Sequence, residues 1–143
     1  MMSSQQSRQF GDGDASFQAA GGIEGIERLV EDFYRIMDDI EEAAVIRAMH
    51  AKDLTVVKDK LARFLCAWLG GPKRYAEKYG PISIPKVHAR WPIGDDDSRA
   101  WLLCMERAIA LQPYSPEFAD YLLTQLRVPA SRIVELQRAM ANS

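Results

Sequence analysis

The residues of this chain with the most recognisable chemistry are its two histidines, His50 and His88. A neutral imidazole nitrogen is a common metal ligand. No HExxH zinc motif, GxxxxGKS/T phosphate loop or GxSxG nucleophile elbow accompanies them. The two cysteines, Cys66 and Cys104, stand apart inside apolar runs and form no CxxC pair. They are therefore predicted to be small buried thiols rather than zinc ligands. A Ser-His-Asp arrangement stays open, although a small all-helical chain is an unusual host for one.

His88 lies in a stretch between Gly80 and Gly94 that three prolines interrupt, so only a short helix fits around it. Trp91 follows directly, and a long predicted helix bearing Trp101 begins soon after. One protein nitrogen holds a bare metal ion weakly, but it suffices for an iron whose four in-plane ligands come from a porphyrin. These features are compatible with haem. A structural or exposed histidine is the alternative that the residue types leave open.

The elements that must position these residues are helices. Apolar residues recur at steps of three and four, and no segment alternates with period two, so an all-α fold of antiparallel helices is predicted. The first helices are expected over 23–40 and 41–49. The next is expected to begin after Asp53, as N-cap, and to end at Gly70-Gly71-Pro72, before a short piece over 73–79.

The second half of the chain is predicted to hold three further helices. An acidic first turn at 95–97 suits the positive end of a helix, and that helix is expected to stop before Pro113. Pro116 suits the first position of the next helix. Pro129 is predicted to start a separate last helix.

The composition limits both the domain organisation and the partners. Residues 1–22 are Ser-, Gln- and Gly-rich and are predicted to be a flexible polar tail on one domain over 23–143, although Phe10 and Phe17 are available to dock. The net charge of −2 gives no basic face for nucleic acid. No apolar run approaches the roughly 20 residues that span a bilayer, and the N-terminus has no signal-peptide pattern. A cytoplasmic protein is therefore expected.

Several blocks of residues resemble the group II truncated haemoglobins over about residues 23–126. They are Phe33-Tyr34, Asp53-Leu54-Thr55, Phe64-Leu65, Trp68-Leu69-Gly70-Gly71-Pro72 with Tyr75, His88, and Ala100-Trp101-Leu102 with Cys104-Met105. The WLGGPxxY and AWLxCM blocks are specific in combination. The resemblance implies a two-over-two helical sandwich around haem b.

The resemblance also assigns roles to individual residues. His88 matches the family's proximal iron ligand. The distal residues, expected to surround and stabilise a bound ligand, match Tyr34, His50, Val57 and Trp101. The residues expected to contact the haem or its propionates are Phe33, Lys60, Leu61, Phe64, Tyr75, Lys86 and Trp91.

The chain departs from the family's pattern ahead of His88. Family members often carry Gly-His-Pro and several basic residues there. Here the loop reads Gly80-Pro81-Ile82-Ser83, and Lys86 is the one basic residue in the run 84–87. Anchoring of the propionates on that side is therefore expected to differ.

What the resemblance implies for function is O2 binding, with other diatomic ligands, at a five-coordinate iron. The hydroxyl of Tyr34, the indole N–H of Trp101 and an imidazole N–H of His50 are the expected donors. The alternatives are a haem enzyme, for NO dioxygenation or peroxidase-like chemistry with an external reductase, and a haem-free helical module. A monomer or homodimer is expected, and whether His50 itself coordinates iron is open.

Overall fold

The computed structural model describes residues 9–81 and 94–141 of the chain. Within these ranges the regular elements are helices, and no strand occurs. They are α2 (Ala15–Ala19), α3 (Gly22–Asp39), the 3-10 helix η1 (Glu41–Ala43), α4 (Ala44–Ala48), α5 (Thr55–Trp68), α6 (Arg74–Tyr79), α8 (Asp95–Ala110) and α9 (Pro116–Ala141). The predicted all-α class is confirmed. In the described part of the chain, no helix is both long enough and apolar enough to cross a bilayer.

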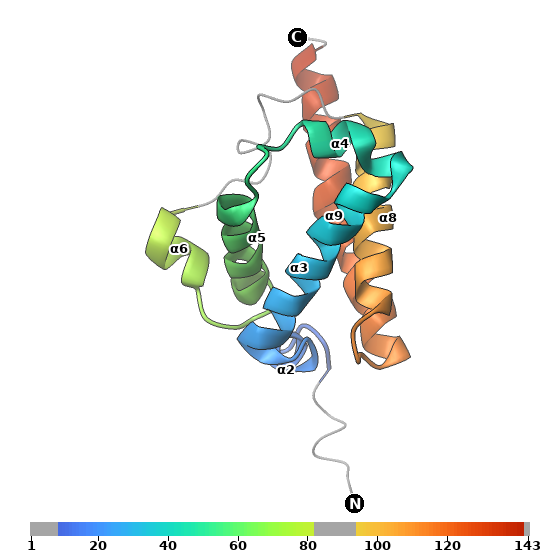
Figure 1. The fold of residues 1–143 in the computed structure, drawn as a ribbon. Helices are drawn as coiled ribbons and strands as arrows, with labels where there is room; N and C mark the ends of the chain where they lie inside the picture. The colour runs from blue at the N-terminus through green and yellow to red at the C-terminus, as the bar shows by residue number, and fades with distance from the viewer. Residues whose placement is uncertain (1–8, 82–93, 142–143) are drawn as a thin grey trace, which may run out of the picture.

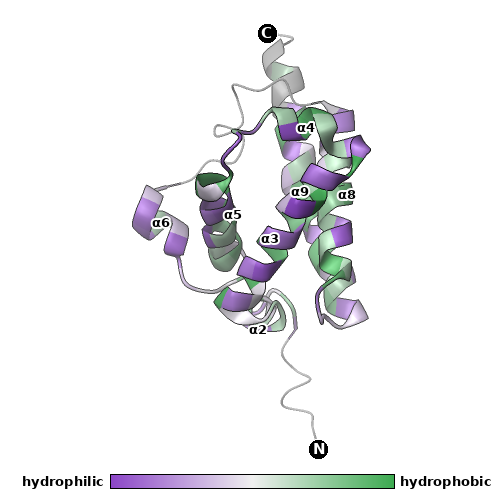
Figure 2. Cartoon of the chain, viewed as in Figure 1, coloured by the Kyte–Doolittle hydropathy of each residue, from purple (hydrophilic) through white to green (hydrophobic). Residues whose placement is uncertain are grey.

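Helix α3 lies at the centre of the arrangement (Figure 1). It packs against α5 on one side and against α8 on the other, and α8 packs along α9. The short helix α6 contacts α5, and α4 contacts both α3 and α8. The long helices therefore form two pairs, α3 with α5 and α8 with α9. Figure 2 shows hydrophobic residues along much of α8 and hydrophilic residues on α6 and on the viewed side of α3.

The buried face of α3 explains its central place. Its apolar residues recur every three or four positions, and Ile26, Leu29 and Phe33 are fully buried. On α8, which packs against α3, Cys104 and Met105 are equally buried. Because one face of α3 is buried and the opposite face is solvated, the buried face sets the rotation of the helix about its axis. That rotation fixes the direction of every other side chain on α3.

Two helix starts use the acidic residues that the sequence singled out. Asp53 Oδ1 accepts hydrogen bonds from the backbone N–H of Thr55 at 2.9 Å and from its hydroxyl at 2.6 Å, just ahead of α5. These bonds lower the pKa of Asp53. At α8, Asp97 Oδ2 accepts the N–H of Gly94 at 2.9 Å. Both carboxylates satisfy N–H groups that a helix start leaves without partners.

The prediction of a separate helix from Pro129 was wrong, because α9 runs unbroken through Pro129. A proline inside a helix removes one backbone hydrogen bond. The buried residues nevertheless continue at four-residue spacing across it. They are Phe118, Leu122, Leu126, Ala130 and Val134. Burial of this continuous stripe offsets the missing bond.

Residues 9–22, the larger part of the predicted tail, pack on the domain. Phe17 is buried and donates its backbone N–H to the Leu69 carbonyl at 3.0 Å. The Phe10 ring lies 5.1 Å from the Phe118 ring. The place where the N-terminal segment passes over the end of α5 requires glycine. Gly70 has φ +92°, and a Cβ on Gly71 would overlap the Phe17 ring. The Gly-Gly-Pro turn therefore both ends α5 and admits the N-terminal segment.

Cys66 and Cys104 are buried free thiols, as predicted. Burial raises the pKa of the Cys104 thiol to about 11. A thiol with so high a pKa stays protonated at neutral pH and is a poor nucleophile.

Candidate functional site

Aromatic rings meet where α3, α4 and α8 come together. Phe33 and Tyr34 are consecutive on α3, and their ring centroids lie 4.9 Å apart. The Phe33 ring lies 5.2 Å from that of Trp101 on α8, and the Tyr34 ring lies 5.7 Å from that of His50, just beyond α4. All three ring pairs are edge-to-face, the arrangement that aromatic pairs favour. The structure therefore brings together four predicted site residues from three separate segments.

Tyr34 is the most buried polar group of this cluster, with 5% of its surface exposed. Burial raises the pKa of its phenol far above the ordinary value, because the phenolate would lose its hydration. The hydroxyl therefore keeps its proton across the physiological range. A protonated phenol can donate a hydrogen bond, which is the role that the family resemblance implies.

His50 is partly buried, and its Nδ1 lies 2.8 Å from the carbonyl oxygen of Ile46. A carbonyl only accepts, so Nδ1 must donate. In the neutral imidazole this hydrogen bond puts the single proton on Nδ1 and a lone pair on Nε2. This tautomer differs from the expected donor role of His50, because a neutral ring held in this way offers an acceptor at Nε2.

Helix α5 carries two apolar stripes. One is buried and consists of Ala62, Leu65 and Cys66, with Leu69 just after the helix. The second lies roughly a third of a turn away and is only half-buried. Its members are Val57, Leu61, Phe64 and Trp68.

This half-buried stripe bears on the fit of a haem. Phe64 and Trp68 stack with centroids 6.1 Å apart and planes at 23°. Trp101 and Leu102 of α8 are also half-buried against the core. These half-covered apolar side chains lie on two helices that both pack against α3, the helix of the buried Tyr34 phenol. Such a set suits a large flat apolar group that carries a polar ligand on one face. The described residues therefore fit the cofactor that the sequence predicts.

Lys60 and Tyr75, expected near the haem propionates, belong to a separate cluster on α5 and α6. The Lys60 ammonium lies 5.2 Å from the centroid of the Tyr79 ring, and Tyr75 packs against the same ring at 5.0 Å. Tyr75 is buried, with 8% of its surface exposed. A cation over an aromatic face is itself a stabilising contact, so the geometry gives Lys60 a partner within the protein.

At the centre of that cluster is Asp59, which the sequence reasoning missed. Its carboxylate accepts hydrogen bonds from Lys78 Nζ at 2.9 Å, Tyr79 Oη at 2.6 Å and Arg63 Nε at 2.9 Å. The bonds from Lys78 and Tyr79 are the main reason that the pKa of Asp59 falls well below its ordinary value. The Asp59–Arg63 pair was visible as an i,i+4 spacing. The contacts with α6 had no signal in the sequence.

The remaining predicted residues, His88, Lys86 and Trp91, lie outside the described residues. Their roles stay predictions.

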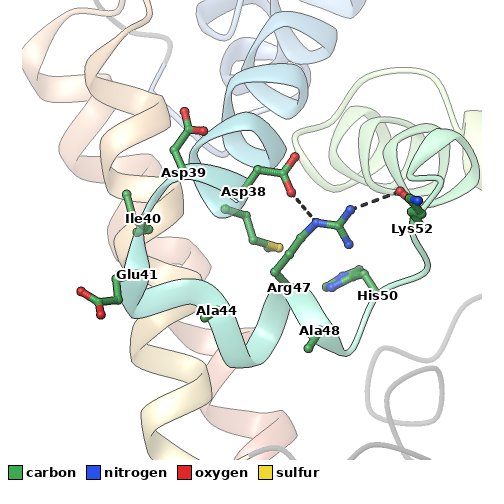
Figure 3. Close-up of a pocket in the computed structure, with 10 residues that line it drawn as sticks. Asp38, Asp39, Ile40, Glu41, Ala44, Arg47, Ala48, His50 and Lys52 are labelled. Carbon is green, nitrogen blue, oxygen red and sulfur yellow. Dashed lines mark hydrogen bonds and ion pairs between the residues drawn. The ribbon is translucent and has the colours of Figure 1, made fainter.

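A surface pocket of about 580 Å³ lies beside the aromatic cluster, at the corner between α3 and α4. Among the predicted site residues, His50 is the one that lines it. Figure 3 shows Arg47 crossing this corner between Asp38 and the backbone at Lys52.

A family model described as bacterial-like globin matches residues 15–133, which include α2. The group 2 truncated hemoglobin YjbI of Bacillus subtilis (strain 168) is 29% identical over 126 residues, covering 88% of this chain and 92% of that protein.

Two solved structures extend the similarity to the fold. The group II 2-on-2 hemoglobin of Agrobacterium tumefaciens is 31% identical, with a TM-score of 0.78 over 82% of this chain and 92% of that one. The truncated oxygen-avid haemoglobin of Bacillus subtilis is 29% identical, with a TM-score of 0.77 over 84% and 98%. The predicted two-over-two arrangement is confirmed.

Proposed function

The chain belongs to the bacterial-like globin family and, within it, to the group II truncated haemoglobins, and from this membership we propose that it holds haem b through His88 and retains O2 by distal hydrogen bonds. Haem-based oxygen binding is what the family supports. The identity of the donors and the strength of retention are the parts that this proposal adds. The observation that carries it is the buried phenol of Tyr34, whose ring contacts those of Phe33 and His50, with Trp101 on the other side of Phe33.

When bound, haem would supply an iron able to coordinate a diatomic ligand and to shift electron density onto it. The protein's part is to meet that charge with preorganised donors. Tyr34 supplies an O–H whose proton is secured by burial, and Trp101 supplies an indole N–H. Because Phe33 packs against both rings, neither donor has to be ordered at the moment of binding.

The half-buried residues of α5 have a different part. Val57 and Leu61 have no hydrogen-bonding groups, so they exclude water and limit access to the ligand. Exclusion of water strengthens each hydrogen bond inside the site, because the local dielectric falls. His50 contributes an acceptor at Nε2 while neutral, since Ile46 takes its Nδ1 proton.

Retention of O2 suits storage, sensing or O2-dependent chemistry better than bulk delivery. The Bacillus subtilis relative is described as oxygen-avid, which supports this view by analogy. NO dioxygenation with an external reductase is the competing function. A stopped-flow assay of NO consumption by the oxygenated protein, with and without a reductant, distinguishes the two.

The experiment that tests the proposal is the rate of O2 release from Tyr34→Phe and Trp101→Phe, measured by stopped-flow displacement with CO. Removal of one donor from a dry site costs about 1–3 kcal/mol, or roughly a factor of 5–150 in release rate at constant association rate. Tyr114→Phe is the matched control, because Tyr114 is a half-buried tyrosine whose hydroxyl bonds the Ala20 carbonyl at 3.4 Å, away from the site. If both site variants release O2 as fast as the wild type, the donors are wrongly assigned.

A further inference from the structure

The guanidinium of Arg47 joins two segments at the corner beside the site. Its Nε donates to Asp38 Oδ1 at 2.5 Å, its Nη1 to the Ala51 carbonyl at 3.0 Å and its Nη2 to the Lys52 carbonyl at 3.2 Å. Figure 3 shows the side chain reaching from α4 to the end of α3 and to the segment before α5. The Arg47 side chain is 22% exposed, so most of it is covered.

His50 is held from both sides along the chain, by α4 before it and by the guanidinium after it. Before it, the His50 N–H donates to the Arg47 carbonyl at 3.0 Å, and its Nδ1 donates to the Ile46 carbonyl. After it, Ala51 and Lys52 are the residues whose carbonyls the guanidinium holds. The guanidinium of Arg47 therefore fixes the backbone that leaves His50, while main-chain carbonyls of α4 hold His50 itself.

The bond from Arg47 to Asp38 links this backbone to α3, the helix that carries the Tyr34 phenol. Asp38 follows Tyr34 by four residues on α3, about one helical turn. The Tyr34 and His50 rings lie 5.7 Å apart across the corner. A link from Asp38 through Arg47 to residues 51 and 52 fixes the separation between the two segments that carry these rings.

An ordinary surface ion pair would not have this effect. Arg35 pairs with Asp32 at 2.8 Å within α3, with 60% of the Arg35 side chain exposed, and such pairs contribute little. Arg47 instead donates to two carbonyls of a non-helical segment, as well as to a carboxylate. Its planar fork of donors matches this set, whereas a lysine offers one point charge.

We propose that Arg47 is a positioning residue that holds His50 at a set distance from Tyr34, and so sets the distal side of the ligand site. The inference rests on the proposed function for its consequence on O2 release. Its structural content is that the segment 49–54 loses its order when the guanidinium is removed.

The test uses the full-length, haem-loaded protein as Arg47→Ala, Arg47→Lys and the matched control Arg35→Ala. Hydrogen exchange of the amides of 49–54 is measured by mass spectrometry, and the ring nitrogens of His50 are followed by ¹⁵N NMR. We expect exchange to accelerate by about tenfold or more in Arg47→Ala, because local opening exposes these amides. The His50 nitrogen shifts should move away from the Nδ1–H pattern. Arg47→Lys should fall between, and Arg35→Ala should match the wild type.

Release of O2 then shows whether Arg47 acts through His50. Arg47→Ala should change the release rate in the same direction as His50→Ala, and should add nothing in the double variant. Fully multiplicative effects would overturn the positioning role, as would unchanged exchange at 49–54 in Arg47→Ala. If Arg47→Ala does not fold, Asp38→Asn, which keeps a neutral acceptor, is measured in its place. If His50→Ala leaves release unchanged, the proposed function of His50 fails, while the exchange and NMR results still decide the positioning claim.

Discussion

The junction of α3, α4 and α8 and the junction of α5 with α6 both carry residues that the sequence predicts for the site, but different forces hold the two junctions. At the first, Phe33 and Tyr34 are buried and contact Trp101 and His50 through their rings. At the second, a carboxylate that is 31% exposed, that of Asp59, accepts bonds from Lys78 and Tyr79. The first should respond to lost volume and hardly to salt or acid. The second junction should respond to salt and acid and hardly to lost volume.

The largest effect is expected from Phe33→Ala. Removal of a fully buried phenyl ring costs about 3–5 kcal/mol of unfolding free energy, because it leaves a cavity that the helices cannot fill. Urea unfolding followed by circular dichroism measures this. Val56→Ala is the control, since Val56 on α5 is 57% exposed and its truncation should cost less than about 0.5 kcal/mol. Equal losses in both variants would show that the junction is not held by burial.

The next effect is alkaline destabilisation through Tyr34. Burial raises its pKa in the folded state, so above pH 10 the unfolded state loses the phenol proton first. The stability contribution is complete below pH 10 and falls as the pH rises, by up to about 1.4 kcal/mol per pH unit for one group. Tyr114, whose pKa burial raises to about 12, adds to the slope. Denaturation midpoints between pH 9 and 11 should fall less steeply in Tyr34→Phe, and an identical slope would contradict the burial argument.

At the α5–α6 junction, Asp59→Asn should cost about 1 kcal/mol, because the loss of charge weakens three hydrogen bonds that are partly screened by water. The folded-state pKa of Asp59 is depressed. Its contribution is therefore present above the ordinary carboxyl pKa near 4 and is lost as the pH falls below it. Acid unfolding curves of the variant should lose this component. Asp96→Asn, at an exposed pair with Arg99, is the control and should leave the curve unchanged.

The smallest effect is that of salt on the same junction. An increase in ionic strength from 0.1 to 1 M shortens the electrostatic screening length from about 10 to 3 Å. It should weaken the Lys78–Asp59 ion pair by a few tenths of a kcal/mol. Hydrogen exchange should accelerate at 74–79 while the amides of α3 around Phe33 stay unchanged. Equal acceleration in both regions would remove the distinction between them.

Much of the fold was predictable from local patterns. The apolar spacing of α3 and the Gly70-Gly71-Pro72 stop defined elements that the structure reproduces. The prediction of a helix start at Pro129 was wrong because it considered the missing hydrogen bond alone. It left out the buried stripe from Phe118 to Val134 that continues past the proline. A local rule fails where burial over a whole helix outweighs one missing hydrogen bond.

The sequence alone determined the helical class and, through the resemblance, predicted that Tyr34, His50 and Trp101 belong to one site. These properties depend on residue type and spacing along the chain. Only the tertiary structure decided that the Phe33 ring contacts those of Tyr34 and Trp101, that the Ile46 carbonyl accepts a hydrogen bond from His50 Nδ1, and that Arg47 spans the corner. The Phe33 and Arg47 contacts join separate segments, and the Ile46 bond depends on how the chain turns after α4. Their partners are set by how the helices cross and turn, which no local periodicity encodes.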